Sequence, residues 1–537
     1  MPVLLDQAVR RFGPRNALNF KGKTISYEDL GRQVDRLAAG LQRVGVRKGT
    51  KVGLFLPNTP AFVIYYYAIL KAGGVVVNYN PLYSLEELSY QIKDSGTEMM
   101  VTHDLAALFS KPESLLASGT IKTLIVHPFT DQLPAAKALL FRLFKSKDRA
   151  FPSRSAAKAR ILDGAELAAT REKMQPVVIN PTEDVAVLQY TGGTTGTPKG
   201  AMLTHANLQA NMQQVDVWAA DLEVGQERIL GALPLFHVFA MTAVMNLGIV
   251  KGAEIILMPR FQLQEAMELI SKEKPTMLPA VPTIFTAMLH APNLKSFDFS
   301  SLKFCISGGA ALPLEVKLAF EKMAGCKVVE GYGLSVASPV ITCNPIVGRV
   351  VAGSIGLPLP RTMVSLRDLD DPTKEVALGE RGELCATGPQ VMKGYWNRPQ
   401  ETEAQFIDGF LRTGDVATMD ENGFFQIVDR IKDLIICSGF NVYPRRIEEA
   451  IYEHPAVEEV TVIGIKDSYR GEAPKEFIKL KTGMRATQAD IFRHLEPKLS
   501  KIEMPSQIEF RESLPKTIIG KLSKKELVAE EAARSES

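Results

Sequence analysis

The chain carries the sequence Tyr190-Thr191-Gly192-Gly193-Thr194-Thr195-Gly196-Thr197-Pro198-Lys199-Gly200 between a strand expected at residues 185–189 and a helix expected at residues 205–219. Glycines let backbone N–H groups approach phosphate oxygens, threonine hydroxyls add donors, and a lysine adds positive charge. The stretch is not a Walker A loop, because no Gly-x-x-x-x-Gly-Lys-Ser/Thr pattern can be laid over it. A plain turn is the simpler interpretation, but this density of glycine, threonine and lysine favours a phosphate ligand.

Short β-rich runs alternate with longer helical runs around this loop. Strands are expected at residues 51–56, 99–102, 123–126 and 185–189, and helices at residues 61–72, 85–95 and 205–219. Such alternation is typical of βαβ units, which bind ligands where loops leave the strand ends. The expected fold class is α/β, with a large N-terminal domain of βαβ subdomains and mostly parallel sheets.

The pattern changes near residue 432. A helix is expected at residues 442–454, followed by a compact α+β set with strands at 457–465, 476–481 and 507–510 and a helix at 488–499. A chain of 537 residues is also too long for one hydrophobic core, because single cores stop growing at roughly 250 to 300 residues. We therefore predict an N-terminal domain at residues 1–431 and a small α+β C-terminal domain at residues 432–537.

The overall charge and the cysteines limit the classes of function. Sixty-three basic residues nearly balance 60 acidic ones, so the net charge of +3 gives no field that would attract nucleic acid. The five cysteines (Cys305, Cys326, Cys343, Cys385 and Cys437) are odd in number and never form a Cys-x-x-Cys pair. This pattern argues against a disulfide framework and a zinc site, and it fits a reducing cytosol.

Three segments bear on membranes. The first 12 residues include Asp6 and Arg10 and do not resemble a signal peptide. Residues 229–250 lack charge and are long enough to span a bilayer, but Pro234, His237 and Asn246 interrupt them, so we expect a buried strand and a buried helix. Residues 137–160 are basic with interleaved Leu and Phe. They are interpreted first as a solvated surface helix and loop, and alternatively as a contact with an anionic membrane surface.

Further motifs follow the glycine-rich loop in a fixed order. They are Leu233-Pro234-Leu235-Phe236-His237, Ser307-Gly308-Gly309-Ala310, Glu330-Gly331-Tyr332-Gly333-Leu334, Leu411-Arg412-Thr413-Gly414-Asp415, Asp429-Arg430-Ile431-Lys432 and Pro515-Lys516-Thr517-Ile518-Ile519-Gly520-Lys521. From about residue 17 to residue 527 the sequence resembles the adenylate-forming acyl-CoA synthetases, and most of all the bacterial long-chain fatty acid–CoA ligases. The run from residue 408 to residue 430 is close to the fatty-acyl signature within that superfamily.

The resemblance implies a reaction and its catalytic residues. A fatty acid would react with ATP to give acyl-AMP and pyrophosphate, and the acyl group would then pass to coenzyme A; ATP, Mg²⁺ and coenzyme A are the expected cofactors. Two anions meet in the first step, so cations and N–H donors must neutralise charge and align the reactants. By resemblance, Lys521 bridges the carboxylate and the α-phosphate, Thr191 and Lys199 belong to the phosphate loop, and His237 lies at the mouth of the acyl site.

The resemblance also assigns the nucleotide and thiol sites. Residues Thr191 to Gly196 would hold phosphates, and Asp415 would accept from two ribose hydroxyls with help from Arg430. Gly308, Gly309, Ala310, Glu330, Gly331, Tyr332 and Gly333 would form the adenine slot, with Tyr332 stacking on the base. Lys432 matches the hinge about which the mobile C-terminal domain swings, and Ser438 and Gly439 would then face the thiol of coenzyme A.

The chain departs from the family pattern after Leu334. The family has threonine and glutamate where this chain has Ser335 and Val336. Serine keeps a hydroxyl for the α-phosphate, but valine cannot coordinate Mg²⁺, so no side chain is assigned to a metal. Either ATP phosphates and waters hold the metal, or the protein is a slow or specialised variant. A second departure, Arg446 where an acidic residue is common, lies away from the reacting atoms.

The prediction is thus a cytosolic fatty acid–CoA ligase, monomeric or homodimeric, that acts on small molecules and touches the inner membrane, if at all, through the basic stretch. Two alternatives remain open. One is a ligase for a medium-chain or aryl carboxylic acid, and the other is an acyl- or nucleotide-binding homologue of low activity, for which Val336 is the support.

Overall fold

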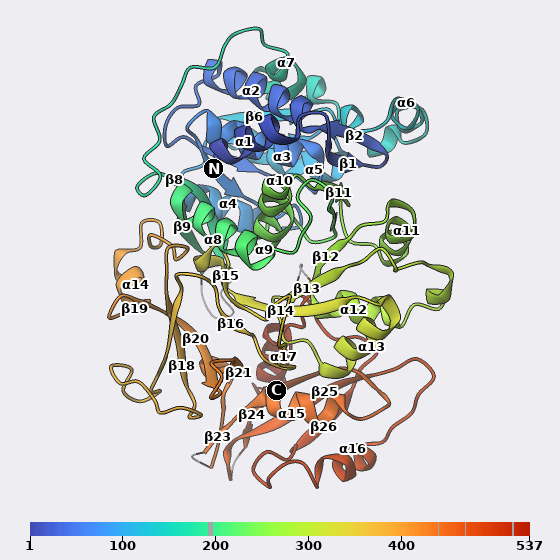
Figure 1. The fold of residues 1–537 in the computed structure, drawn as a ribbon, viewed down its shortest axis with the longest axis vertical. Coiled ribbons are helices and arrows are strands. Elements are labelled where there is room, and N and C mark those ends of the chain that lie inside the picture. Colours follow the sequence, from blue (N-terminus) through green and yellow to red (C-terminus); the bar gives the residue numbers. More distant parts are fainter. Residues whose placement is uncertain (192–196, 439, 468, 518–519, 537) are drawn as a thin grey trace.

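Four β-sheets organise the chain. A computed structural model describes residues 1–191, 197–438, 440–467, 469–517 and 520–536. Over these residues the sheets have seven, nine, five and five strands. In Figure 1 the seven-stranded sheet lies in the upper part of the molecule and the last sheet lies at its lower end.

The seven-stranded sheet has the order β7-β6-β5-β3-β4-β8-β9. Its strands are β3 (Lys51–Leu54), β4 (Val75–Asn78), β5 (Met99–His103), β6 (Thr123–His127), β7 (Ile161–Asp163), β8 (Val185–Thr191) and β9 (Lys199–Thr204). All neighbours run parallel except β8 and β9. Runs of Val in β4 and of Met and Val in β5 fit strands that are buried throughout, as expected for parallel strands that helices cover on both faces.

The nine-stranded sheet has the order β16-β15-β14-β13-β12-β10-β11-β1-β2. Its strands are β1 (Asn16–Phe20), β2 (Lys23–Ser26), β10 (Arg228–Gly231), β11 (Glu254–Leu257), β12 (Met277–Ala280), β13 (Phe304–Gly308), β14 (Lys327–Gly333), β15 (Val340–Cys343) and β16 (Leu357–Pro358). The central pairs from β1 to β14 are parallel, and only the edges are antiparallel. The predicted α/β class with mostly parallel sheets is confirmed.

Helices cover both parallel sheets, while two smaller sheets follow towards the C-terminus. The helices are α1 (Pro2–Phe12), α2 (Tyr27–Arg43), α3 (Pro60–Lys71), α4 (Leu85–Ser95), α5 (Ala106–Ala117), α6 (Ala135–Phe144), α7 (Gly164–Ala168), α8 (His205–Trp218), α9 (Val238–Ala240), α10 (Leu247–Lys251), α11 (Leu263–Glu273), α12 (Pro282–Leu289), α13 (Leu314–Ala324), α14 (Pro399–Ala404), α15 (Pro444–Tyr452), α16 (Gln488–Leu495) and α17 (Lys525–Glu536). The third sheet holds β17 (Met363–Arg367), β18 (Gly382–Thr387), β19 (Phe406–Ile407), β20 (Phe410–Met419) and β21 (Phe425–Arg430).

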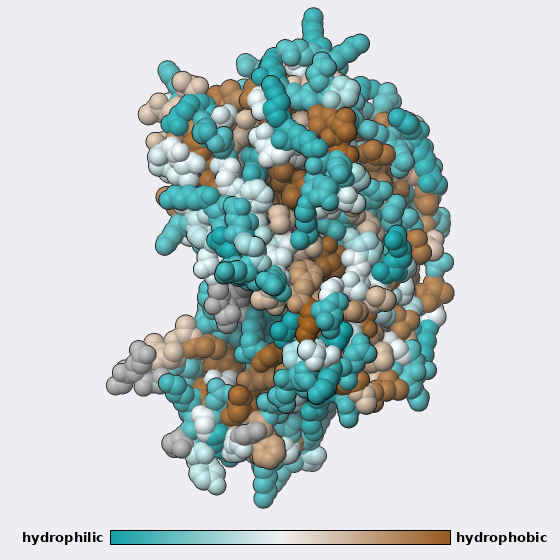
Figure 2. All heavy atoms as spheres, turned by 90° about the vertical axis from the view of Figure 1, so that its left-hand side faces the viewer, coloured by the Kyte–Doolittle hydropathy of each residue, from teal (hydrophilic) through white to brown (hydrophobic). Residues whose placement is uncertain are grey.

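The last sheet has a core of its own. It holds β22 (Ile435–Cys437), β23 (Phe440–Val442), β24 (Val457–Asp467), β25 (Gly471–Leu480) and β26 (Gln507–Phe510). A cluster of buried side chains that includes Ile435, Ile447, Val462 and Ile478 fills the space between this sheet and α15 and α16. Figure 2 shows a hollow at mid-height of the molecule, above the lower end that contains this sheet.

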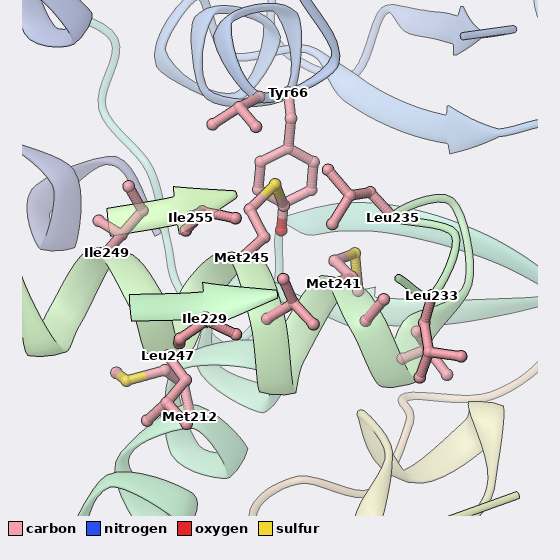
Figure 3. Packing of buried hydrophobic residues seen from close by; sticks show 14 of the residues in the cluster. Tyr66, Met212, Ile229, Leu233, Leu235, Met241, Met245, Leu247, Ile249 and Ile255 are labelled. Carbon is pink, nitrogen blue, oxygen red and sulfur yellow. The ribbon is translucent and has the colours of Figure 1, made fainter. Parts of the chain in front are cut away.

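The uncharged stretch at residues 229–250 folds as the sequence predicts, into the buried strand β10 followed by buried helical turns. The turns are α9, a π-helical segment at Met241–Asn246 and α10. Figure 3 shows side chains of this stretch packed against neighbours from α3, α8 and β11; the labelled residues are Tyr66, Met212, Ile229, Leu233, Leu235, Met241, Met245, Leu247, Ile249 and Ile255. No helix in the described residues is long and apolar enough to cross a membrane.

One strand was not predicted. The helix expected at residues 205–219 is present as α8, which begins at His205, but the antiparallel strand β9 lies between the glycine-rich loop and this helix. Gly200 lies opposite Tyr190, and a Cβ atom at Gly200 would come within 3.2 Å of the tyrosine ring. Glycine at position 200 therefore lets the hairpin form where Pro198 and the glycines of the loop suggest only an irregular loop. Residues Gly192, Gly193, Thr194, Thr195 and Gly196 lie outside the described residues.

Candidate active site

The ends of β13 and β14 form a narrow wall. The two strands are parallel neighbours, with Gly308 opposite Gly331 and Ser307 opposite Glu330. A Cβ atom at Gly308 would lie 3.1 Å from the ring of Phe239 and 3.3 Å from the carbonyl oxygen of Gly331. Ligands bind beyond the carboxyl ends of parallel strands, which is where these glycines lie. The close packing explains why position 308 is a glycine. Without a side chain there, the backbone lies at the surface of the wall.

Two buried charges lie behind this wall. Glu330 and Lys317, a residue of α13, are 6% and 4% exposed, and their charged atoms are 4.0 Å apart. Burial raises the pKa of Glu330 to about 7, although the positive charges of Lys317 and Arg445 oppose the shift. Within the described part of the chain, neither Oε1 of Glu330 nor Nζ of Lys317 has a hydrogen-bond partner. Sequence reasoning missed Lys317, because a single lysine in an amphipathic helix ordinarily faces solvent.

Three side chains meet beside the wall, from β14, β20 and β21. The hydroxyl of Tyr332 donates to Oδ2 of Asp415 at 2.6 Å, and Nε of Arg430 lies 3.3 Å from Oδ1 of the same carboxylate. Asp415 is only 6% exposed, and β20 and β21 place it directly opposite Arg430. A carboxylate held in this way can accept hydrogen bonds from ligand hydroxyls. The predicted pair of Asp415 and Arg430 is therefore close in space, and Tyr332 joins it.

Lys521 comes to the same place from the C-terminal end of the chain. A Cβ atom at Gly309 would lie 2.6 Å from Cε of Lys521 and 3.0 Å from its Nζ, so the lysine stem covers this glycine. Gly309 has φ +86°, a conformation that favours glycine. Burial and the positive charge of Arg430 lower the pKa of Lys521 to about 8, while Asp415 acts in the opposite direction. The lysine side chain thus lies within electrostatic reach of Arg430 and Asp415.

A hydrogen bond from α12 holds the Lys521 loop. The hydroxyl of Thr283 donates to the carbonyl oxygen of Gly520 at 2.7 Å. Gly520 has φ +84°, and the loop closes on itself where the backbone N–H of Lys521 donates to the hydroxyl of Thr517 at 3.1 Å. Sequence reasoning missed Thr283, because it stands in no motif and its role depends on a chain segment more than 200 residues away.

His237 lies before the buried helical turns. Its Nδ1 accepts from the backbone N–H of Phe239 at 3.3 Å, so the imidazole caps α9. Burial, followed by the positive charge of Lys521, lowers the pKa of His237 to about 3. The ring is therefore neutral at physiological pH, and it lies near enough to Lys521 to sense its charge.

The described ends of the glycine-rich loop are fixed in the β8–β9 hairpin. Thr191 pairs with Lys199, and its hydroxyl donates to the carbonyl oxygen of Lys199 at 3.4 Å. The ammonium group of Lys199 lies 4.5 Å from the centre of the Tyr395 ring. The hairpin therefore holds Thr191 and Lys199 opposite each other at the edge of the seven-stranded sheet.

The segment after Leu334 offers no carboxylate for a metal. Ser335 begins a short 3₁₀ turn at Ser335–Ala337, and Val336 is 5% exposed in the main hydrophobic core. The carbonyl oxygen of Val336 accepts from the backbone N–H of Met392 at 2.8 Å. The described residues contain no group of three or more His, Cys, Asp or Glu side chains that could hold a metal ion. The apolar side chain at position 336 does not fit a role as Mg²⁺ ligand.

The segment at Lys432 connects the third sheet to the last one. Lys432 is exposed in a short turn at Ile431–Asp433. Oδ2 of Asp429 accepts from the backbone N–H of Arg445 at 2.8 Å, so a contact crosses this segment. Ser438 is exposed with φ +53°, and its N–H donates to the carbonyl oxygen of Arg470 at 2.7 Å. Gly439 lies outside the described residues.

Comparison with known proteins identifies the family of the chain. Residues 5–396 match the model of the AMP-binding enzymes, and residues 446–521 match that of the AMP-binding enzyme C-terminal domain. The chain is 44% identical to a long-chain-fatty-acid–CoA ligase from Bacillus subtilis (strain 168), over 98% of this chain and 94% of that protein. It is 38% identical to a long-chain-fatty-acid–CoA ligase from Yersinia pestis, with 98% and 94% covered.

Solved structures show the same fold. The chain superposes on ATP-bound MatB from Rhodopseudomonas palustris with a TM-score of 0.85 and 28% identity, over 98% of each chain. Together the two family models match most of the chain. The chain belongs to the family of AMP-binding enzymes.

Proposed function

We propose that this chain is an AMP-forming fatty acid–CoA ligase. A carboxylate oxygen of the fatty acid attacks the α-phosphorus of ATP and releases pyrophosphate; the sulfur of coenzyme A then attacks the acyl carbonyl, releases AMP and loses its proton to solvent. The observation that carries this proposal is the placement of Lys521 over Gly309, beside the set formed by Tyr332, Asp415 and Arg430.

Lys521 acts in the first step. Its ammonium group pairs with the incoming carboxylate and with the α-phosphate, and so offsets the repulsion between two anions in a partly buried site. A pKa of about 8 leaves the group mostly protonated at neutral pH, and bound anions raise that pKa further. Thr191, Lys199 and residues Gly192 to Gly196 bind the phosphates.

The nucleoside end of ATP is held by the wall and the three meeting side chains. Gly308, Gly309, Ala310 and residues Glu330 to Gly333 line the adenine, with the Tyr332 ring against the base. Asp415 accepts from the ribose hydroxyls while Arg430 keeps the carboxylate in place. Ser335 donates to the α-phosphate, and the neutral ring of His237 lies at the mouth of the acyl site.

The second step uses a different orientation of the C-terminal domain, which we propose to span residues 432–537. Rotation about Lys432 withdraws Lys521 and brings Ser438 and Gly439 to the thiol of coenzyme A. The contacts that would have to break include the hydrogen bond from Thr283 to Gly520, the packing of Lys521 on Gly309, the hydrogen bond from the backbone N–H of Arg445 to the Asp429 carboxylate, and the contact of the Arg381 guanidinium with the Tyr443 ring.

Mg²⁺ is proposed as the metal that accompanies ATP. Since Val336 offers no ligand, the ion would be held by phosphate oxygens and waters, which Mg²⁺ retains readily. No step is assigned to a metal bound by this chain. Val336 is also the support for the second candidate function, an acyl- or nucleotide-binding homologue of low activity.

The partners proposed are small molecules: a long-chain fatty acid, ATP and coenzyme A. The alternative substrates are medium-chain and aryl carboxylic acids. We place the protein in the cytosol as a monomer or homodimer, with peripheral contact to the inner membrane through its basic stretch.

Mass spectrometry of the reaction products tests the proposal. Purified protein is mixed with palmitate, ATP and Mg²⁺, with and without coenzyme A, next to the variants Lys521→Ala and Val336→Glu. The expected products are palmitoyl-AMP and palmitoyl-CoA from the native chain and none from Lys521→Ala. Product from Val336→Glu alone would mark the chain as impaired. Reaction with only shorter or aryl acids would refute the long-chain substrate class.

A further inference from the structure

Helix α6 exposes an apolar face that the proposed ligase chemistry does not use. None of its residues is buried, and four large side chains are more than half exposed: Leu139 at 59%, Leu140 at 53%, Leu143 at 62% and Phe144 at 78%. Their spacing puts them on one side of the helix. We call them the α6 patch. Figure 1 shows α6 at the edge of the upper part of the molecule, apart from the helices that cover the sheets.

The opposite side of α6 is fastened to the protein. Phe141 packs against the main core, with its ring centre 5.4 Å from that of Phe129. Nζ of Lys137 donates to the carbonyl oxygen of Lys21 at 2.7 Å, and Arg142 donates to the hydroxyl of Thr130 at 3.0 Å. The α6 patch therefore cannot be buried by turning the helix over, because the anchoring residues hold the other face inward.

Positive charge accompanies the α6 patch along the chain. Residues 134–160 contain eight Lys or Arg and one acidic residue, whereas the whole chain has a net charge of only +3. Lys147, Arg154, Lys158 and Arg160 are exposed beyond the end of the helix, and we call them the basic strip. Between them the ring of Phe151, which is 40% exposed, lies 4.6 Å from the guanidinium of Arg154. Exposed apolar and cationic side chains thus follow one another along residues 137–160.

This combination suits one kind of partner. Exposed Leu and Phe enter the acyl region of a bilayer, while Lys and Arg pair with anionic headgroups. Nucleic acid would use the basic strip but would leave three leucines without a partner. A symmetric contact between two copies of the chain would bring two equally positive surfaces together, which opposes association.

We propose that α6 lies in the surface of an anionic lipid bilayer, with the α6 patch inserted among the acyl chains and the basic strip on the headgroups. At about 15 Å the helix is too short to span a membrane, so it lies in the plane of the interface. The inference deepens the proposed peripheral membrane contact and rests on it. It also gives the contact an orientation, since the face of the molecule with α6 turns towards the lipid.

Sedimentation with lipid vesicles tests this. Vesicles of phosphatidylcholine with phosphatidylglycerol are compared with vesicles of phosphatidylcholine alone, for the native chain and for Leu140→Ser/Leu143→Ser/Phe144→Ser. A matched control is Leu314→Ser/Leu318→Ser, because these leucines of α13 are similarly exposed, at 48% and 55%. We expect the native chain and the control to sediment with anionic vesicles and the triple variant to bind at least about tenfold more weakly.

A fluorescent probe reports insertion directly. The five native cysteines are buried, so an environment-sensitive dye can be attached selectively to Leu143→Cys or, as a control, to Leu318→Cys. We expect the emission of the dye at position 143 to rise and shift to the blue with anionic vesicles, and that at position 318 to stay unchanged. A dye at 143 that remains in water would overturn the inference.

Three other outcomes would also overturn it. In the first, the triple variant binds vesicles as tightly as the native chain does. In the second, the native chain binds no vesicles. In the third, the native chain is a dimer and the triple variant is a monomer. Assays with the water-soluble substrate octanoate keep the proposed ligase activity separate. Ligase activity on octanoate that is equal in all variants, with vesicle binding lost only in the triple variant, would support the inference.

Discussion

The candidate site joins two regions that are held in different ways. The wall at Gly308 and Gly331 is fixed by five consecutive register pairs between parallel strands inside the main core. The Lys521 loop arrives from the other end of the chain, and its contacts there include the close packing on Gly309 of the wall and the hydrogen bond from Thr283 of α12 to Gly520. We propose that the rigid region binds the nucleotide, and that the Lys521 loop, which can move away, neutralises charge in the first step.

Removal of the Lys521 ammonium group tests the role of the Lys521 loop, and this change should have the largest effect. Lys521→Ala should lower the rate of acyl-AMP formation by roughly 100-fold to 1000-fold, the usual effect of removing one charge-stabilising donor from an active site. Thioester formation from synthetic palmitoyl-AMP should change little. Pyrophosphate release measures the first step and thioester absorbance the second. Equal loss in both steps would contradict a role confined to the first.

Removal of the Asp415 carboxylate tests whether the rigid region binds the nucleotide. Asp415→Ala should weaken ATP and AMP binding by roughly 10-fold to 100-fold, because hydrogen bonds to a charged group are each worth about 1.5–3 kcal/mol. Both half-reactions should suffer, in contrast to Lys521→Ala. Calorimetric titration with AMP checks this without turnover. Unchanged AMP affinity would remove Asp415 from the nucleotide site.

The hydroxyl of Thr283 should have a smaller, one-sided effect. Thr283→Val removes one hydrogen bond to the Lys521 loop, worth about 0.5–1.5 kcal/mol net, so acyl-AMP formation should slow by roughly 2-fold to 10-fold. The second half-reaction should stay unchanged or become faster. The matched control is Thr286→Val on the same helix, whose hydroxyl bonds only within α12. If the two variants behave alike, the contact has no special role.

The pH dependence should follow Lys521. Its pKa of about 8 means that the ammonium form dominates below pH 8 and is lost above it, so kcat/KM for the first step should fall as the pH rises through 8. In Asp415→Asn the opposing negative charge is gone, and the fall should move to lower pH. A profile that stays flat up to pH 10 would show that this proton is not required.

Much of the fold could be predicted because it depends on local pattern. The helix at residues 85–95 was predicted with the bounds that α4 has, since Ser84 and Glu87 form a capping box. The hairpin at β8 and β9 was not predicted, because it depends on how Gly200 fits against Tyr190 across the pair. Proline and glycine near a turn indicate a loop and do not indicate which element follows it.

The site was accessible from the sequence only in part. The motifs named Asp415, Arg430 and Tyr332, and the structure brings these three together. Thr283 and Lys317 stand in no motif, and their positions are set by the packing of α12 and α13. Contacts between segments hundreds of residues apart depend on tertiary packing, which local propensity does not encode.

The fate of the carboxylate oxygens of the fatty acid tests the central claim most directly. Palmitate labelled with ¹⁸O in both carboxylate oxygens is incubated with ATP and coenzyme A, and the AMP is analysed by mass spectrometry. Acyl transfer from palmitoyl-AMP to the thiol leaves one labelled oxygen on the phosphate, so the account predicts AMP that carries one ¹⁸O. Unlabelled AMP, or ADP with labelled inorganic phosphate, would contradict an acyl-adenylate intermediate.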